Sequence, residues 1–315
     1  MCNHALKTMP MKPTNHVLMV RPAIFCANSQ TVSTNFFQQA LPFDKDEALV
    51  RAQSEFDQLV AVLRKHGVCV SVYQDSPMPE TPDALFPNNW FVSLPQQHAI
   101  LFPMMAPNRR AERTKAVMAH LEQEGHHTKK ITDYAAFEQQ GVFLEGTGSM
   151  VMDIPNKIAY CAISPRSNKR LFEQFCAEFG FTPVSFHAYQ SIDNKRMLIY
   201  HTNVLMALGP EFVVVCLDAI DNTAERLFLE DTLHASGKTI IDITAAQVHQ
   251  FVGNMLALTA DDGSPLMAMS SQAYNALTAP QLKQLRRYAQ PVHSPIPTIE
   301  TLGGGGVRCM MAELY

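Results

Sequence analysis

A recurring order of elements is the feature of this sequence that most constrains its fold. Five times along the chain, a stretch with apolar residues at helical spacing passes through a glycine or a proline into a strand-like run. In the first stretch, this spacing runs from Leu49 to Leu63, and Gly67 follows the helix that it predicts. The five stretches are residues 44–73, 108–131, 167–186, 222–243 and 271–296.

Paired apolar runs between these stretches predict β-hairpins, as in residues 89–94 with 99–104 and residues 149–154 with 157–163. Each module then contains one helix and about three short strands. An open doubly wound sheet does not accommodate hairpins between its helices, whereas a closed ring of ββαβ modules does. We therefore expect an α/β fold, a five-fold pseudosymmetric α/β propeller whose strand ends converge on a central active site.

The absence of linkers predicts one domain, and the net charge indicates which kinds of partner to expect. No Gly/Ser-rich or Pro-rich linker interrupts the modules, so we expect one catalytic domain over residues 1–315, with residues 1–15 as a loose N-terminal tail. Hydrophobic residues make up 47% of the chain, which supplies a sizeable core. The net charge of −4, without a dense Lys/Arg run, argues against nucleic acid as a partner. A small molecule is the expected partner, and a homo-oligomer is left open.

Apolar runs and cysteines bear on the cellular compartment. No apolar run reaches the roughly 20 residues that span a bilayer, and the N-terminus lacks the apolar core of a signal peptide. We expect a cytoplasmic protein without a membrane partner. Seven cysteines are scattered without a C-x-x-C pair, which fits neither a disulfide framework nor a zinc site. Five of them, such as those in residues 68–73 and 213–217, lie in apolar runs and are interpreted as small buried residues.

Four consecutive glycines, at positions 303–306, distinguish Cys309 from the other cysteines. Ordering glycine costs conformational entropy, so such a run usually serves a close backbone approach or a positive φ. The run lacks the Lys-Ser/Thr pair and the following helix of a phosphate loop. A flexible tail is one interpretation, but Val307 and residues 310–314 look like a terminal strand with Cys309 at its edge. That position suits a nucleophile that attacks a planar substrate.

A cysteine nucleophile reacts as a thiolate and needs a partner that protonates the leaving amine, usually a histidine. His201 lies within the apolar run 197–208, although a histidine satisfied in the core is the alternative. Glu145 also lies in an apolar run, and a buried carboxylate is costly unless it is paired, for example with a cation or an imidazolium. Polar residues punctuate the apolar segment 82–90 as well, where a tight turn is the alternative to a functional role.

Taken in this order, the segments resemble the pentein superfamily of arginine deiminases, dimethylargininases and amidinotransferases over nearly the whole chain. Residues 82–89 resemble the dimethylargininase substrate loop, with Asp83 at its first acidic position and Asn89 at its second. Residues 106–110 and 163–168 are similar to elements whose arginines hold the substrate α-carboxylate, which implies that role for Arg166 and, more weakly, Arg109. The Phe-Pro-Asn-Asn-Trp stretch at 86–90 is shared with the citrulline-utilisation hydrolase branch.

The resemblance implies a mechanism and its residues. Cys309 falls on the family's nucleophile, His201 on its general acid/base and Glu145 on its catalytic acidic residue. The implied reaction proceeds through a covalent cysteine adduct and requires no metal and no organic cofactor. We expect these three side chains to line one cleft, facing Asp83 and Arg166 across a gap that fits an amino acid.

Three amides stand where relatives carry carboxylates. Asn88 and Asn89 replace the Glu and Asp of dimethylargininases, and Asn203 replaces the Asp of the His-x-Asp motif in arginine deiminases and amidinotransferases. Each lost carboxylate removes a charge-assisted hydrogen bond of about 1.5–3 kcal/mol from a bound cation, whereas an amide still donates to a carbonyl oxygen. A neutral ureido group is therefore favoured, and we expect citrulline to be hydrolysed to ornithine, CO₂ and ammonia.

Several alternatives stay open beside this hypothesis. Arginine is not excluded by charge, because Asp83 and Glu145 remain, so an arginine deiminase or a dimethylargininase is the first alternative. An amidinotransferase would pass the adduct to an amine, and a non-catalytic pentein would use the scaffold as a binding module. The expected substrate-binding residues are Asp83, Asn88, Asn89, Arg109, Arg166 and Asn203.

Overall fold

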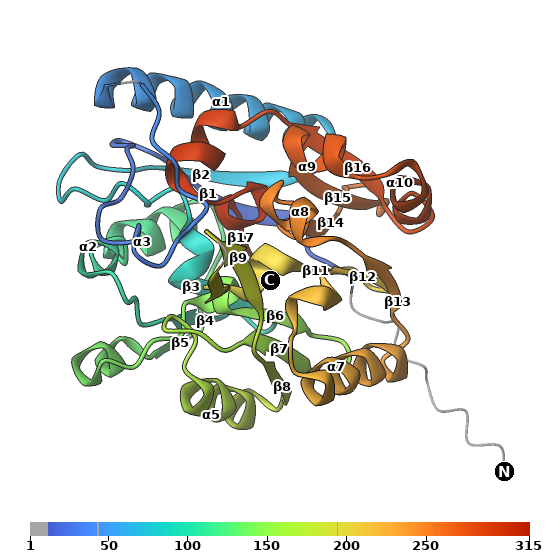
Figure 1. The fold of residues 1–315 in the computed structure, drawn as a ribbon. Coiled ribbons are helices and arrows are strands. Elements are labelled where there is room, and N and C mark those ends of the chain that lie inside the picture. The colour runs from blue at the N-terminus through green and yellow to red at the C-terminus, as the bar shows by residue number, and fades with distance from the viewer. Residues whose placement is uncertain (1–11, 43, 194) are drawn as a thin grey trace, which may run out of the picture.

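The computed structural model describes residues 12–42, 44–193 and 195–315. In these residues, five three-stranded sheets and one two-stranded hairpin build a mixed α/β fold. Figure 1 shows the longer helices around the outside of the molecule and the strands toward its middle. No helix in the same ranges is long and apolar enough to cross a membrane.

Four of the sheets repeat one order, in which an antiparallel hairpin is followed by a helical segment and a strand parallel to the hairpin's second strand. The strands of these sheets are β3 (Phe91–Leu94), β4 (His98–Leu101) and β5 (Lys130–Asp133); β6 (Met150–Asp153), β7 (Ile158–Ala162) and β8 (Thr182–Phe186); β11 (Met206–Leu208), β12 (Phe212–Val215) and β13 (Thr239–Asp242); and β14 (Leu256–Thr259), β15 (Pro265–Ser270) and β16 (Gln290–Ser294). The linking helices are α2 (Pro107–Arg110) with α3 (Lys115–Gln123), α5 (Lys169–Phe179), α7 (Thr223–Ala235), and α9 (Ser271–Ala276) with α10 (Ala279–Leu285).

The fifth sheet joins the two ends of the described chain. Its central strand β1 (His16–Arg21) pairs in parallel with β2 (Cys69–Gln74) and antiparallel with β17 (Ala312–Glu313). Helix α1 (Lys45–Lys65) connects β1 to β2, so all five predicted helix-to-strand stretches form a helical segment and a strand. Of the expected N-terminal tail, residues 1–11 lie outside the described residues, whereas the hydroxyl of Thr14 donates to the carbonyl of Leu314 at 2.6 Å.

Local signals explain where α1 begins and ends. The side chain of Asp44 accepts the N–H of Glu47 and caps the helix, and Gly67, with φ of +76°, follows its last turn. Cys69, interpreted as a small buried residue, is instead exposed, because β2 is the edge strand of its sheet. The described cysteines are all free thiols, and Cys2 lies outside the described residues.

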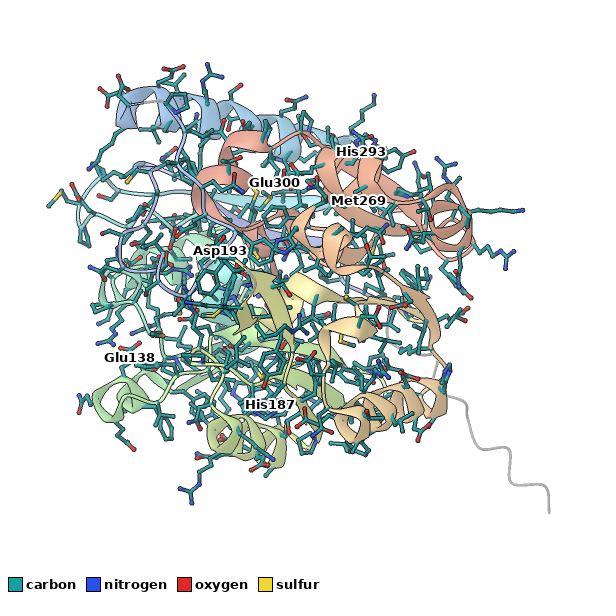
Figure 2. The ribbon with its side chains drawn as sticks, in the orientation of Figure 1. Glu138, His187, Asp193, Met269, His293 and Glu300 are labelled. Atoms are coloured by element: carbon teal, nitrogen blue, oxygen red, sulfur yellow. The ribbon has the colours of Figure 1, made fainter. Side chains whose placement is uncertain are left out.

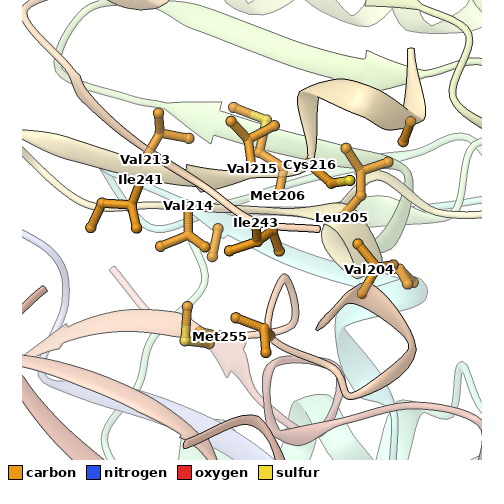
Figure 3. Packing of buried hydrophobic residues seen from close by; sticks show 14 of the residues in the cluster. Val204, Leu205, Met206, Val213, Val214, Val215, Cys216, Ile241, Ile243 and Met255 are labelled. Atoms are coloured by element: carbon orange, nitrogen blue, oxygen red, sulfur yellow. The ribbon is translucent and has the colours of Figure 1, made fainter. Parts of the chain in front are cut away.

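The core shows the alternation expected of strands. Figure 3 shows Val213 and Val215 on one side of β12 and Val214 on the other, and all three are fully buried. Burial on both sides is possible because α7 covers one face of this sheet while neighbouring modules, including Met255, pack on the other. The sheets therefore form a rigid frame in which the strand ends are fixed.

Short helical turns precede strands of the sheets, and most of the predicted site residues lie in these turns or directly before them. They are η1 (Pro87–Asn89) before β3, α4 (Gly146–Ser149) before β6, α6 (Thr202–Leu205) before β11 and η5 (Val307–Met310) before β17, with a turn at residues 251–253 before β14. The expectation that Cys309 lies at a strand edge is wrong. Its N–H donates to the carbonyl of Gly306 at 3.1 Å, which closes a 3₁₀ turn and delays the strand.

The remaining elements lie between or beside the modules. The hairpin of β9 (Tyr189–Ile192) and β10 (Lys195–Leu198) leads directly into His201. Shorter helical segments are η2 (Ala135–Gln140), η3 (Leu217–Ala219), α8 (Ala245–His249) and η4 (Ile299–Gly303).

Candidate active site

Side chains from distant parts of the sequence line one small cavity. The predicted residues that line it are Asp83, Asn89, Arg109, Arg166, His201 and Cys309, and they are joined by Asn35, Phe86, Tyr200, Gly303, Gly304 and Gly305. Glu145 and Asn203 reach this group through contacts with His201 and Cys309, whereas Asn88 lies outside the cavity. The volume of about 20 Å³ holds about one water molecule, so the cavity is smaller than the expected amino-acid-sized gap.

Glu145 and His201 form a buried pair. Glu145 directly precedes α4, and its N–H donates to the hydroxyl of Ser149 at 2.8 Å, which fixes its backbone. Its Oε2 lies 2.8 Å from Nε2 of His201, and its Oε1 accepts the N–H of Met105 at 3.0 Å. With Nε2 held by Glu145, Nδ1 is the ring nitrogen of His201 that remains for proton transfer.

Burial and neighbouring charges shift the pKa values of this pair. Burial lowers the pKa of His201, and the bond to Glu145 offsets that shift only in part. Burial alone would raise the pKa of Glu145, but Arg166 and His201 outweigh it and hold that pKa below its usual range. At neutral pH the pair is therefore an ionised carboxylate beside a neutral imidazole.

Two asparagine side chains contact the thiol of Cys309. Nδ2 of Asn254 lies 3.2 Å from Sγ, and Nδ2 of Asn203 lies 3.6 Å from it. Asn254 also donates to the carbonyl of Asn203 at 2.8 Å and accepts the N–H of Cys309 at 3.4 Å. Asn254 therefore ties the turn before β14 to both neighbouring turns.

Sequence reasoning missed Asn254. The signal that would have found it is the Gly253-Asn254 pair directly before a strand, the module position at which other site residues occur. Gly253 is needed there, because a Cβ atom at this position would lie 2.3 Å from the carbonyl oxygen of Val204.

The protonation state of Cys309 follows from its surroundings. Burial raises the pKa of the thiol, while the hydrogen bond from Asn254 and the charge of Arg308 oppose that shift. The net direction is upward, so the thiol is protonated at neutral pH in this closed structure. A nucleophilic role for this sulfur would require the proton to leave.

Arg109 is held by a neighbour that sequence reasoning missed. Its Nε and Nη2 donate to the two carboxylate oxygens of Glu112 at 2.8 and 2.9 Å, and its Nη1 donates to Oδ1 of Asn89 at 2.7 Å. The fork expected to bind a substrate carboxylate is thus occupied by Glu112. Arg109 instead fixes the position of Asn89 in the cavity wall.

Residues 22–42, called the strap below, close the cavity from outside. Nδ2 of Asn35 lies 3.2 Å from the carbonyl oxygens of both Gly303 and Gly304. Gly304 has φ of +63°, and a Cβ there would lie 2.6 Å from Nδ2 of Asn35. The glycine run therefore serves a close approach of backbone and strap, and the closed strap explains the small volume of the cavity.

The strap also holds two predicted substrate-binding residues. Arg166 donates through Nη2 to the hydroxyl of Thr34 at 2.5 Å and to the carbonyl of Thr31 at 3.2 Å, and its Nη1 lies 3.7 Å from Oε2 of Glu145. Asp83 accepts through Oδ2 from Asn28 at 2.7 Å. Burial raises the pKa of Asp83, against the opposing charge of Arg109.

The two remaining predicted amides, Asn88 and Asn89, both have side-chain atoms without a hydrogen-bond partner in the described residues. Nδ2 of Asn89 and both polar side-chain atoms of Asn88 are buried without a hydrogen-bond partner among residues 12–42, 44–193 and 195–315. Gly148 gives Asn89 and His201 their close packing, since a Cβ there would lie 2.3 Å from Nδ2 of Asn89 and 2.8 Å from Nδ1 of His201.

Within residues 12–42, 44–193 and 195–315, no group of three or more His, Cys, Asp or Glu side chains is arranged to hold a metal ion.

Comparisons with known proteins identify the family of the chain and proteins that share its fold. The family model described as "N,N dimethylarginine dimethylhydrolase, eukaryotic" matches residues 21–315. The curated proteins contain no match.

Solved structures share the fold at low sequence identity. The N-terminal domain of ArgZ bound to substrate, from an arginine dihydrolase of the ornithine-ammonia cycle in Cyanobacteria, is 15% identical, with a TM-score of 0.70 and coverage of 95% of this chain and 98% of that domain. The longer ArgZ chain, in its apo structure, is also 15% identical, with a TM-score of 0.71. That match covers 95% of this chain but 40% of the ArgZ chain.

A third structure is a dimethylarginine dimethylaminohydrolase variant as its adduct with S-methyl-L-thiocitrulline. It is 14% identical, with a TM-score of 0.63, and the match covers 95% of this chain and 98% of the other. These neighbours and the family model confirm the resemblance to penteins and the expected enzyme class. The chain belongs to the N,N-dimethylarginine dimethylhydrolase family of the pentein superfamily.

Proposed function

We propose that the chain is a cysteine-dependent hydrolase of ureido amino acids, with citrulline as its substrate and Cys309 as its nucleophile. The observation that carries this proposal is the amide lining at the thiol, where Asn203 and Asn254 lie within 3.6 Å of Sγ. Amides donate to a ureido oxygen and accept from its NH₂ group, but they supply no negative charge to a guanidinium. The lining therefore suits a neutral planar group.

The reaction follows from the pair beside the thiol. Sγ of Cys309 attacks the ureido carbon while the thiol proton passes to neutral His201, which then protonates the departing amine of ornithine. A carbamoyl group remains on sulfur. His201 next takes a proton from water while the water oxygen bonds to the carbamoyl carbon. The carbon–sulfur bond then breaks, and the proton returns to sulfur. The released carbamate gives CO₂ and ammonia, and ionised Glu145 stabilises the imidazolium in both steps.

Substrate binding requires the strap to open, because the closed cavity holds about one water molecule. Opening would release Arg166 from Thr31 and Thr34 and free its guanidinium for the α-carboxylate of the substrate. Arg109 would not compete for that carboxylate, since Glu112 occupies its fork.

Arginine is the second candidate substrate, and Asp83 is the observation that favours it. Oδ1 of Asp83 is buried without a hydrogen-bond partner in the part of the chain that the structure describes. A guanidinium would satisfy that oxygen with a charge-assisted bond. An arginine deiminase, an arginine dihydrolase or a dimethylargininase would each use this contact, and an amidinotransferase would deliver the adduct to an amine.

The test compares kcat/KM for citrulline, arginine and dimethylarginine on one preparation, with ornithine, citrulline and ammonia all quantified. Preference for citrulline, with one ornithine for each ammonia, is the expected result. Citrulline accumulating from arginine would refute it. Cys309→Ala should abolish turnover while Cys216→Ala, at a buried thiol of the core, should not. Oxygen-18 from labelled water in the CO₂ would separate hydrolysis from transfer.

We also propose that the five modules close into a five-fold ring and form one catalytic domain in the cytoplasm. Pairing of β17 with β1, which joins the last module to the first, supports closure. Light scattering would measure whether the chain forms a homo-oligomer.

A further inference from the structure

Two cavities lie outside the active site, and no residue of the strap lines either of them. The first has a volume of about 50 Å³ and the second about 70 Å³. They adjoin each other, because both are lined by Met152, Ile154, Leu208, Leu256, Glu313 and Tyr315. The second reaches Pro155 and Pro210, which are exposed. Together the two cavities, called the rear chamber below, run from the interior to the surface without touching the strap.

At two places, neighbouring residues of the chain face the rear chamber and the active site. Arg308 lines the chamber and the next residue, Cys309, lines the active-site cavity. Thr147 lines the chamber and the next residue, Gly148, packs against the ring of His201. The chamber therefore approaches the proposed nucleophile and the proposed general base from behind.

The chamber is built for water. Its lining includes the hydroxyls of Ser93 and Thr147 and the ion pair of Arg308 with Glu313, at 2.7 Å. Thr147 donates to the carbonyl of Asn88 at 3.3 Å. A water molecule needs about 10–15 Å³ and two to four polar partners, and each cavity exceeds that volume.

Asn88 supplies an independent observation. Its side chain is fully buried, and neither polar atom has a partner in residues 12–42, 44–193 and 195–315. Buried amides are almost always bonded to protein or to ordered water. Its backbone carbonyl accepts from Thr147 of the chamber wall, so water beside the chamber would supply the missing partner.

We propose that the rear chamber holds ordered water and supplies the molecule that hydrolyses the adduct on Cys309. This inference rests on the proposed function. While ornithine and the closed strap fill the front of the site, bulk water cannot reach the adduct from that side. Water from the chamber gives its proton to His201, its oxygen bonds to the carbamoyl carbon, and the carbon–sulfur bond breaks. The first half of the reaction needs no water and does not depend on the chamber.

The test fills the chamber without touching the proposed catalytic residues. Ala207 is buried and lines the first cavity, so Ala207→Leu displaces water from it. The matched control is Ala268→Leu, which overpacks a buried strand position outside both cavities. Rapid quench would follow ornithine formation, and mass spectrometry would measure carbamoylated Cys309.

The expected result for Ala207→Leu is a first-turnover burst of ornithine like that of the unaltered chain, followed by steady-state turnover slowed about tenfold. Carbamoylated Cys309 should accumulate, and Ala268→Leu should show neither effect. If Ala207→Leu does not fold, Thr147→Val removes a chamber hydroxyl at nearly constant volume and should give the same pattern. If Ala207→Leu slows the ornithine burst and steady-state turnover equally, or slows neither, the chamber proposal is wrong. The proposed function would not be affected by that result. A lack of hydrolysis of both citrulline and arginine by the unaltered chain overturns the proposed function and this inference with it.

Discussion

Nε2 of His201 lies 2.8 Å from Oε2 of Glu145, although 56 residues separate the two in sequence. The contact orients the imidazole and leaves Nδ1 for proton transfer. A carboxylate in this place stabilises the imidazolium that each half of the proposed reaction forms. The contact therefore leads to the first prediction.

Glu145→Gln should lower kcat by roughly 10²–10⁴-fold, the usual contribution of acid–base catalysis. Loss of the neighbouring negative charge should lower the pKa of His201 further and move the acid limb of kcat/KM to lower pH. A pH–rate series on both proteins measures this.

Glu138 provides the matched control for Glu145. It accepts the N–H of Met104, directly before the Met105 that Glu145 binds, and it pairs with Arg113 at 2.7 Å. Figure 2 places it at the edge of the molecule, away from its middle. Glu138→Gln should change stability without moving the pH profile. An identical profile for both variants would contradict the role of Glu145.

Asn254→Ala should raise the pKa of the Cys309 thiol, because it removes the nearer N–H donor to sulfur. We expect kcat/KM to fall about tenfold, for a lost hydrogen bond of about 1.4 kcal/mol. Iodoacetamide alkylation of Cys309 across pH measures the shift. The control Asn222→Ala removes the cap of α7, at about 1 kcal/mol of stability, and should leave the alkylation profile unchanged. An unshifted profile in Asn254→Ala would refute the prediction.

Gly148→Ala should lower activity by displacing side chains of the candidate site. The added Cβ would lie under 3.0 Å from both Asn89 and His201, so the imidazole must move, and a displacement of about 1 Å can lower the rate about 10²-fold. Gly180→Ala is the control, since its Cβ meets no heavy atom within 4 Å in the described chain while its φ of +72° adds backbone strain. Steady-state kinetics and thermal unfolding of both variants decide. Comparable activities at comparable stability would contradict the steric argument.

The buried carboxyl group of Glu300 should make the free energy of unfolding depend on pH. It is 2% exposed, and burial raises its pKa to about 8, against a hydrogen bond from Ser270. Figure 2 shows it inside the fold, below α1. The folded state therefore holds a proton that the unfolded state releases near pH 4.3, so its contribution to stability is lost as pH rises from there through 8.

Glu300→Gln should remove this dependence. The free energy of unfolding should exceed that of the unaltered chain at pH 8 by on the order of 1–3 kcal/mol, and the gain should vanish toward pH 4. Denaturant unfolding at several pH values measures it. Glu173→Gln, at a carboxylate that is 48% exposed, is the surface control for removing a charge. A gain that is independent of pH would argue against a protonated Glu300.

The modules were predictable because their signals are local. Helical spacing before Gly67 and paired apolar runs around Pro155 are properties of neighbouring residues, and they located helices and hairpins. The position of Cys309 in a turn depends on one hydrogen bond to Gly306, which no periodicity reveals.

The site was predictable only where an unusual residue interrupts an apolar run, as His201 and Glu145 do. Asn254 and Glu112 gave no such signal, because their importance lies in partners, Cys309 and Arg109, that the fold supplies. The strap was missed for a related reason. It has neither helical nor alternating periodicity, and its course is fixed by contacts with backbone far along the chain.

The pairing of β17 with β1 has a consequence for how the molecule acquires reactivity. The ribosome releases β17 and the turn with Cys309 after every other strand, and Thr14 meets Leu314 across 300 residues. Such long-range contacts form slowly and late. The turn with Cys309 therefore follows the other candidate site residues in synthesis, and its sulfur meets Asn203 and Asn254 only when this part of the chain docks against the earlier modules. Assembly order would thus keep the proposed nucleophile apart from its neighbours until the first and last strands of the described chain pair.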